Sequence, residues 1–150
     1  MIPGFSNVEN IVLERINRAA EDAATKAGPI FLDAIKGITI NDALSILTGE
    51  PDAATQFLQA QTFNQLYDEF QPELLESLEK FNAVTYWEDA VNAYNKIPLL
   101  ADANPRLDDH VTESALRGLF SLVEEKEKGI RSDVSQRVTP LLQQVFAKQD

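Results

Sequence analysis

The stretch VTESALRGLFSLVEEKEKGI, residues 111–130, carries the clearest helical pattern in the chain. Its apolar and small residues recur at Val111, Ala115, Leu116, Leu119, Phe120, Val123 and Ile130. This spacing places them on one face of an amphipathic helix, with Glu124 and Lys128 paired four residues apart outside. At ~1.5 Å per residue a helix of this length is a rod of roughly 30 Å, long enough to organise a domain.

The N-terminal region has the same helical spacing. Ser6 and Glu9 stand three residues apart, as in a capping box, so we expect a first helix from Ser6 to Ala27. Gly28 and Pro29 should interrupt it, because neither residue favours a helix interior. A short second helix is then predicted over residues 30–36.

The middle of the chain predicts three further helices. Thr39 or Asn41 can cap the third helix, and apolar spacing predicts a fourth over residues 54–70. Pro72 should end or kink that fourth helix, because proline lacks the backbone N–H that the helix needs. Leucines at helical spacing predict a fifth over residues 74–81.

The turn within ILTGEPDAATQF, residues 46–57, separates the third and fourth helices. Gly49 suits a left-handed residue that ends one helix, and Pro51 suits the first turn of the next. Glu50 or Asp52 should cap the fourth helix and complement its positive end. If the turn instead binds a ligand, Asp52 would point inward toward an arginine or an ion.

Two further helices are predicted, one before the long helix and one at the C-terminal end. Thr85 begins a sixth helix in a capping-box pattern, and this helix should stop before Pro98. The final helix carries its apolar residues over 138–146. Pro140 either starts that helix with Thr139 as its cap, or kinks a helix that began near Asp133.

No segment alternates apolar and polar residues for more than a few positions, and no repeat of solenoid length is present. We therefore predict an all-α fold, a single-domain bundle of about seven or eight amphipathic helices over residues 1–150.

The composition limits the classes of partner. The chain has 150 residues, of which 44% are hydrophobic and 25% charged, as in globular domains. Its net charge of −11 disfavours nucleic acid and anionic membrane surfaces, because both bind through basic residues. There is no cysteine, so disulfides and zinc–thiolate sites are excluded.

No segment predicts a membrane span or a signal peptide. The longest apolar run, residues 97–101, is far shorter than the roughly 20 residues that a transmembrane helix needs. The first ten residues, MIPGFSNVEN, lack the basic flank and apolar stretch of a secretion signal.

The loop before the long helix partly matches a calcium-binding loop. Asp102, Asn104 and Glu113 fall at positions one, three and twelve of that motif. Arg106 stands where an oxygen ligand belongs, and Leu107 replaces the required glycine. The alternative is that Asp108 or Asp109 caps the long helix. The candidate metal ligands are Asp102, Asn104, Asp108 and Glu113.

Nothing in the sequence assembles an active site. His110 is the only histidine, and no nucleophile elbow, phosphate-binding glycine loop or zinc-protease motif is present. His110 could act as a general base beside Asp108 or Asp109, but residues this close in sequence rarely form such a pair. We expect no catalysis and no cofactor.

Two groups of side chains are candidates for ligand binding. The aromatic residues of the middle region either fill the core or line a pocket for an apolar ligand, with Tyr67, Trp87 and Tyr94 as candidate contacts. Arg131 and Arg137 either receive an anion or an acidic peptide, or form ion pairs with nearby acids such as Glu125 or Asp133. The aromatic set is Phe57, Phe63, Tyr67, Phe70, Phe81, Tyr86, Trp87 and Tyr94.

Six segments in collinear order resemble one family. They are NRAAEDA (17–23), FLDAI (31–35), INDALSILTGEPDAATQFL (40–58), YNKIP (94–98), VTESALRGLF (111–120) and IRSDVSQRVTPLLQQVF (130–146). The chain resembles the bacterial family of unknown function DUF4197. The resemblance implies an all-helical protein of the cell envelope, periplasmic or associated with the outer membrane, and it brings no catalytic residues.

The chain also departs from the family pattern. We expect that the leader and one or more of the helices that usually precede the NRAAEDA segment are missing or shortened here. Val134 and Pro140 differ from the usual residues near the last helix.

Three functions are compatible with the residues. The first is a non-catalytic envelope protein that binds or scaffolds a partner, either a protein or a small molecule. The second is a small-molecule or lipid binder with an aromatic pocket between helices. The third is a cation-binding protein that uses residues 102–113. The sequence leaves the partner and the oligomeric state open.

Overall fold

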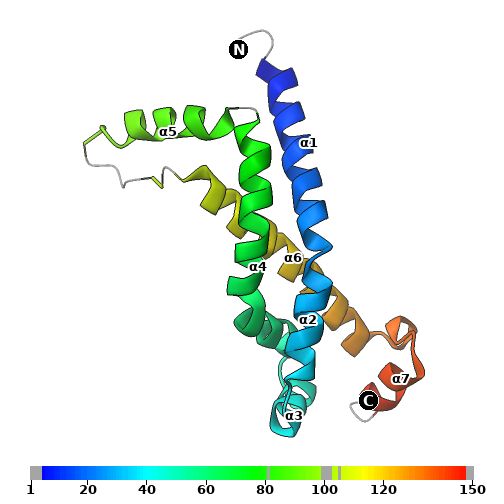
Figure 1. The fold of residues 1–150 in the computed structure, drawn as a ribbon. Coiled ribbons are helices and arrows are strands. Elements are labelled where there is room, and N and C mark those ends of the chain that lie inside the picture. The colour runs from blue at the N-terminus through cyan, green and yellow to red at the C-terminus, as the bar shows by residue number, and fades with distance from the viewer. Residues whose placement is uncertain (1–4, 81, 99–102, 105, 148–150) are drawn as a thin grey trace. The chain divides into compact units, whose positions relative to one another are not determined.

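The computed structural model describes residues 5–80, 82–98, 103–104 and 106–147, without the side chains of residues 5–13, 15, 86, 90 and 93. Figure 1 shows a chain of helices. The helices are α1 (Phe5–Ala24), α2 (Ala27–Lys36), α3 (Ile40–Thr48), α4 (Ala53–Glu79), α5 (Ala83–Tyr94), α6 (Leu107–Ser132) and α7 (Pro140–Phe146), with a 3₁₀ turn over Val134–Gln136.

The all-α prediction is confirmed, since the described residues form seven α-helices, one 3₁₀ turn and no strand. Their contacts divide the chain into two compact units. The first unit comprises Met1–Ile30 and Asn64–Leu116, and the second comprises Phe31–Phe63 and Arg117–Asp150. Each unit is built from two separate stretches of chain, and the boundaries fall within or next to helices, so the prediction of a single domain stays a prediction.

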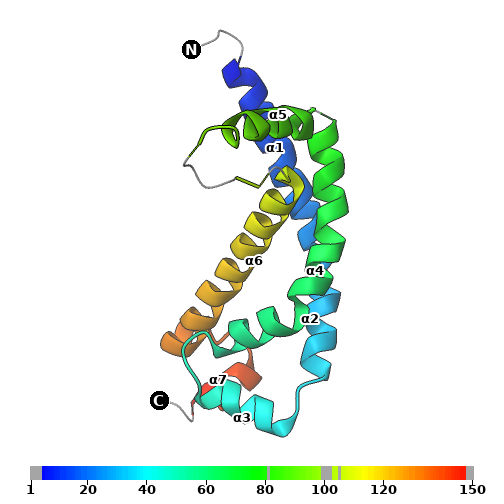
Figure 2. The same cartoon turned by 90° about the vertical axis from the view of Figure 1, so that its left-hand side faces the viewer.

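The first unit has a filled apolar core. Figures 1 and 2 show α1 beside the part of α4 that belongs to this unit, where small residues of α1 permit close approach. An ion pair between Lys26 and Glu73 joins the two segments at the surface. The buried apolar side chains are Ala19, Ala23, Ala27, Ile30, Leu66, Phe70, Leu74, Leu78, Val91 and Leu116.

Of the two effects predicted at Pro72, an end of the helix is wrong, because α4 continues through that residue. The predicted fourth and fifth helices are therefore one helix. Pro72 lies on the exposed side, and the neighbouring core residues Phe70 and Leu74 are almost wholly buried. Burial on both sides of the proline offsets the lost hydrogen bond, which costs about 3 kcal/mol in an isolated helix.

Three helix starts also differ from prediction. The first predicted helix ends at Ala24, and α2 already begins at Ala27, so Pro29 lies in the first turn of α2, where a missing N–H costs little. Helix α5 begins at Ala83, after Asn82 in a left-handed conformation (φ 53°), and Thr85 does not cap it. Helix α1 begins at Phe5, one residue before the predicted cap.

The second unit contains two helix caps that the sequence predicted. Thr39 caps α3 in a reciprocal capping box with Asp42. The Thr139 hydroxyl accepts a hydrogen bond from Leu142 N at the start of α7, which begins at Pro140. Asp133 does not start that helix; it caps the 3₁₀ turn instead. Figure 2 shows α7 near α3 in this unit.

The apolar core of the second unit is small. Among its described residues, Phe120 of α6 is the one fully buried apolar side chain, and its ring lies 5.9 Å from that of Phe31. Many large apolar side chains of this unit are exposed instead. They are Leu32, Ile35, Ile40, Leu44, Leu122, Val134, Val138 and Leu141.

Candidate functional site

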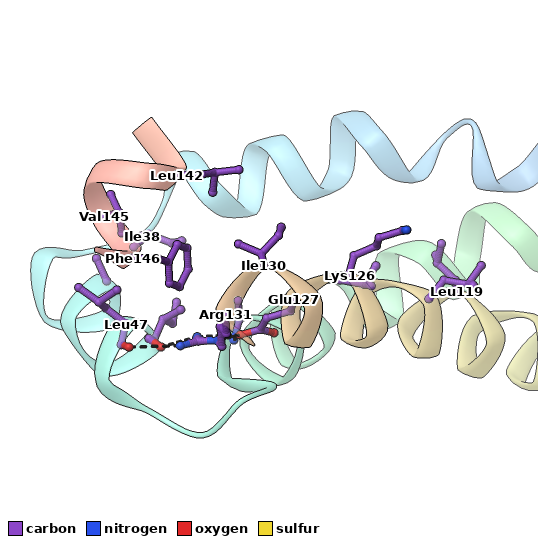
Figure 3. A pocket seen from close by; sticks show the side chains of 15 residues that line it. Ile38, Leu47, Leu119, Lys126, Glu127, Ile130, Arg131, Leu142, Val145 and Phe146 are labelled. Carbon is purple, nitrogen blue, oxygen red and sulfur yellow. Dashed lines mark hydrogen bonds and ion pairs between the residues drawn. The ribbon is translucent and has the colours of Figure 1, made fainter. Parts of the chain in front are cut away.

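The second unit contains a cavity of about 590 Å³. Figure 3 shows it from close by, with walls from α3, the start of α4, α6 and α7. Cavities of this size are in the range of small-molecule sites. The lining residues are Ile38, Ala43, Ile46, Leu47, Ala54, Leu119, Leu122, Val123, Lys126, Glu127, Ile130, Arg131, Leu142, Val145 and Phe146.

Helix α6 supplies the longest wall of the cavity. Its seven lining residues are spaced by one, three or four positions and so occupy one helical face. They are Leu119, Leu122, Val123, Lys126, Glu127, Ile130 and Arg131. The first part of this face follows the predicted amphipathic stripe, whereas three charged residues interrupt the last part. Charged side chains therefore lie beside an apolar cavity.

Arg131 is held at one end of the cavity by hydrogen bonds to helix α3. Its Nη2 donates to Ile46 O at 2.7 Å and its Nη1 to Leu47 O at 3.2 Å. These are carbonyls of the last turn of α3, which have no partner inside the helix. The Arg131 side chain is only 10% exposed and forms an ion pair with Glu127 at 2.7 Å. Arg131 thus closes the C-terminus of α3.

Glu127 performs the complementary task at the start of α4. Its carboxylate accepts hydrogen bonds from Ala54 N at 2.9 Å and Thr55 N at 2.7 Å, and from the Thr55 hydroxyl at 2.8 Å. A carboxylate at this end also complements the positive end of the helix. Burial raises the pKa of Glu127, but the hydrogen bonds from Ala54, Thr55 and Arg131 outweigh it and hold the pKa below its ordinary value.

The Glu127–Arg131 pair therefore binds the helix ends on both sides of the turn between α3 and α4. These contacts differ from the predicted capping of α4. Glu127, rather than Glu50 or Asp52, receives the free amides of α4. Asp52 does not turn toward an arginine; its carboxylate accepts a hydrogen bond from Gln56 Nε2 at 3.0 Å. Pro51 precedes the helix instead of lying in its first turn.

Gly49 ends α3 in an extended conformation (φ −80°), so the predicted left-handed residue is wrong. A Cβ at this position would lie 2.6 Å from Ser45 O and 2.9 Å from the Ala53 Cβ. Close approach of the two helix ends, and not a positive φ, requires glycine here.

Arg137 is 2% exposed and binds the end of α6. Its Nε donates to Ile130 O and its Nη2 to Arg131 O, both at 3.0 Å. The Phe146 ring lies 5.6 Å from the Arg131 guanidinium and 5.7 Å from that of Arg137, within cation–π range. Phe146 thus ties α7 to both arginines.

The predicted ion pair of Arg131 with Glu125 or Asp133 is wrong, because Arg131 pairs with Glu127. The sequence interpretation did not identify Glu127 as a site residue, although its position in the helix was a signal. It lies four residues after Val123 and four before Arg131, on the inward face of the helix. Oppositely charged residues at this spacing on an apolar face indicate a partly buried ion pair.

Lys126 differs from its two charged neighbours. Among the described residues it forms no ion pair or hydrogen bond, and its side chain is exposed. Figure 3 shows it pointing away from the Glu127–Arg131 pair, on the same side of α6 as Ile130. The cavity wall therefore presents one cation without an internal partner.

The predicted aromatic contacts lie in the first unit and do not line this cavity. Tyr67 donates a short hydrogen bond to Asp109, and burial, followed by this bond, raises the pKa of Tyr67 to about 12. Trp87 Nε1 donates to Asn104 O at 3.2 Å, and the Tyr94 side chain is exposed. Phe70 is a core residue, whereas Phe81 and the Tyr86 side chain lie outside the described residues.

Among the described residues, no group of three or more acids and histidines could hold an ion. Because one of the four predicted ligands lies outside these residues, the predicted metal site stays a prediction. Asp102 lies outside the described residues. Asn104 Oδ1 accepts a hydrogen bond from Arg106 N, and Glu113 is exposed on α6.

Asp108 is occupied by two donors. Arg106 Nη2 and Gln71 Nε2 both lie 2.8 Å from its Oδ2. The hydrogen bond from Arg106 is the main reason that the pKa of Asp108 lies below its ordinary value. Asp108 and Asp109 both lie in the first turn of α6, where carboxylates complement the positive end of the helix, but neither caps it, because α6 begins earlier, at Leu107.

In the part of the chain that the structure describes, no helix combines the length and the apolar character that crossing a membrane requires.

Comparison with known proteins gives a family. No curated protein and no solved structure matches the chain. The family described as "Protein of unknown function (DUF4197)" matches residues 1–147, nearly the whole chain. The chain therefore belongs to the DUF4197 family, as its collinear segments indicated.

Proposed function

We propose that this chain is a non-catalytic binding protein of the bacterial cell envelope, and that the cavity of the second unit holds an apolar molecule or the apolar part of one. The observation that carries the proposal is the open cavity of about 590 Å³.

The distribution of apolar side chains supports a bound occupant. The second unit buries one apolar side chain fully among its described residues and leaves eight large ones exposed. Exposed apolar surface of this extent is typical of interaction sites. Of these eight side chains Leu122 lines the cavity, so an apolar ligand there would remove its surface from water, at about 25 cal/mol per Å².

The state of the polar groups favours binding over catalysis. Glu127 and Arg131, the two charged residues at the end of the cavity, form hydrogen bonds with each other and with the ends of α3 and α4. Acid–base catalysis requires a group that can exchange a proton with the substrate. These two side chains stabilise the cavity wall instead.

An uncharged fluorescent probe tests the cavity. N-phenyl-1-naphthylamine emits strongly in apolar sites, and we expect saturable binding to the purified chain. Leu122→Asp places a carboxylate on the cavity wall at a side chain that is 62% exposed, so the fold should tolerate it. This change should weaken probe binding about tenfold or more, because the probe would desolvate the new carboxylate.

Leu32→Asp is the matched control. Leu32 is a leucine of the same unit, 52% exposed on α2, and does not line the cavity. The Leu32→Asp variant should bind the probe as tightly as the unchanged chain does. The proposal fails if the unchanged chain does not bind the probe, or if both variants weaken binding equally while circular dichroism shows that they are folded.

The cellular location is part of the proposal, and the resemblance to exported members of the family supports it. In the native bacterium, antibodies should detect the protein in the periplasmic or outer-membrane fraction. Detection in the cytosolic fraction alone would contradict this placement, while leaving the binding proposal intact.

A further inference from the structure

We infer that the cavity of the second unit binds a single-chain anionic amphiphile, whose hydrocarbon chain lies along the apolar wall and whose carboxylate pairs with Lys126. This inference rests on the proposed binding function and names the chemical class of the ligand.

The first argument is the state of the charges in the wall. Three of the fifteen lining residues are charged, and two of them, Glu127 and Arg131, already bind each other. Lys126 is the remaining one and has no internal partner among the described residues. An occupant therefore meets one available cation. A ligand with a single anionic group matches this arrangement.

The second argument is that the rest of the wall is hydrocarbon. The other twelve lining residues are alanine, leucine, isoleucine, valine and phenylalanine. Their side chains offer neither donors nor acceptors, so a ligand body with polar groups would lose hydrogen bonds to water without replacement. A saturated hydrocarbon chain has no such groups to desolvate.

The third argument is the position of Lys126 within the wall. It follows Leu122 and Val123 and precedes Ile130 at helical spacing on α6, so its methylene stem continues the apolar face while the ammonium reaches water. Figure 3 shows the ammonium on the side away from the ion pair. A carboxylate bound there would stay solvated, which suits an amphiphile with its head group at the surface.

The fourth argument is the distribution of net charge. By sequence, the first unit holds six basic and fifteen acidic residues, a net charge of −9. The second holds seven basic and nine acidic residues, a net charge of −2. The cavity thus lies in the unit that repels an anion least.

Competition between ligands of equal chain length tests the inference. N-phenyl-1-naphthylamine is displaced with decanoate, and separately with decyltrimethylammonium, each below the concentration at which it forms micelles. We expect decanoate to displace the probe at lower concentration. The preference should shrink with added salt, because the head-group ion pair is exposed to solvent.

Lys126→Met keeps the apolar stem and removes the charge. It should reduce the preference for decanoate about fivefold, the effect of one exposed ion pair, and Lys126→Glu should reverse the preference. Lys128→Met is the matched control, because Lys128 lies two residues away, pairs with Glu124 and does not line the cavity. It should leave the preference unchanged.

The outcomes separate this inference from the function on which it rests. If the neutral probe binds but decanoate has no advantage, or if Lys126→Met and Lys128→Met behave alike, the cavity binds apolar molecules and the anionic ligand is wrong. If no probe binds, both proposals fail. If light scattering shows a dimer that Leu122→Asp dissociates, a second copy fills the cavity and the ligand inference is overturned.

Discussion

The first unit buries ten apolar side chains among its described residues, and the second buries one, Phe120. The two units nevertheless share the same kind of sequence, amphipathic helices of alanine and branched aliphatic residues. In the first unit these residues interdigitate, with Leu66, Leu74 and Leu116 wholly buried. In the second unit they surround a cavity, and polar side chains hold the helix ends.

This difference shows that an amphipathic face does not reveal whether it will be filled from within the chain. Helix α6 contributes to both units. Leu116 is buried in the first, whereas Leu122, six residues later, is 62% exposed at the cavity of the second. The first unit is stabilised mainly by apolar burial. The second depends on the Glu127–Arg131 pair and offers its apolar face to an occupant.

The largest effect should come from removing the ion pair of the second unit. Glu127→Ala leaves Arg131 without its partner and uncaps α4, so we expect a loss of about 3–5 kcal/mol in the free energy of unfolding. Glu125→Ala, an exposed neighbour on the same helix, should change it by less than about 0.5 kcal/mol. Urea denaturation measures both. Equal losses in the two variants would show that the pair does not stabilise the unit.

Truncation of one leucine in each unit sharpens the contrast. Leu74 is wholly buried in the first unit, and Leu74→Ala should cost about 3 kcal/mol through lost contacts and a new cavity. Leu122→Ala removes the same atoms from an exposed wall and should cost less than about 1 kcal/mol. Similar losses in thermal or urea unfolding would mean that the second unit is packed as tightly as the first.

The contribution of Glu127 should depend on pH. Because its pKa lies below the ordinary value of 4.5 in the folded chain, the folded state releases its proton more readily than the unfolded state. The stabilisation is therefore complete above about pH 4.5 and is lost as the pH falls through the lower, folded pKa. The stability difference between the unchanged chain and Glu127→Gln should shrink over that acidic range. A difference independent of pH would refute this coupling.

The smallest effect concerns two buried threonines. Thr112, in the first unit, is wholly buried and its hydroxyl has no hydrogen-bond partner among the described residues. Thr112→Val should raise the free energy of unfolding by about 1 kcal/mol. In the second unit the Thr62 hydroxyl donates to Leu58 O at 2.6 Å, so Thr62→Val should lower it by a similar amount. Changes of the same sign would contradict this assignment.

Short-range chemistry was predictable from the residues alone. The caps at Thr39 and Thr139, the start of α7 at Pro140 and the amphipathic course of α6 all depend on residues within about four positions of each other. The predicted helix end at Pro72 was wrong because a local preference for breaking a helix was weaker than the burial of Phe70 and Leu74 beside it.

The site was not predictable in the same way, because its residues come from distant parts of the chain. Glu127 caps Thr55, 72 residues earlier, and Arg131 binds Ile46 O, 85 residues earlier. The aromatic residues were proposed to line a pocket because they are concentrated in the middle of the sequence. That concentration does not determine which helices pack together. The packing of the helices of the second unit gives the cavity a lining of aliphatic residues and Phe146.

Helix formation and capping depend on neighbouring residues, and net charge depends on composition. The sequence by itself therefore determined the all-α class and the acidic character of the chain. The tertiary structure alone decided that Glu127 turns toward α4 and that Arg131 turns toward α3. It also decided that Lys126, beside the cavity, has no partner among the residues that the structure describes. Successive side chains on a helix point in different directions, and only packing against the other helices gives each direction a partner.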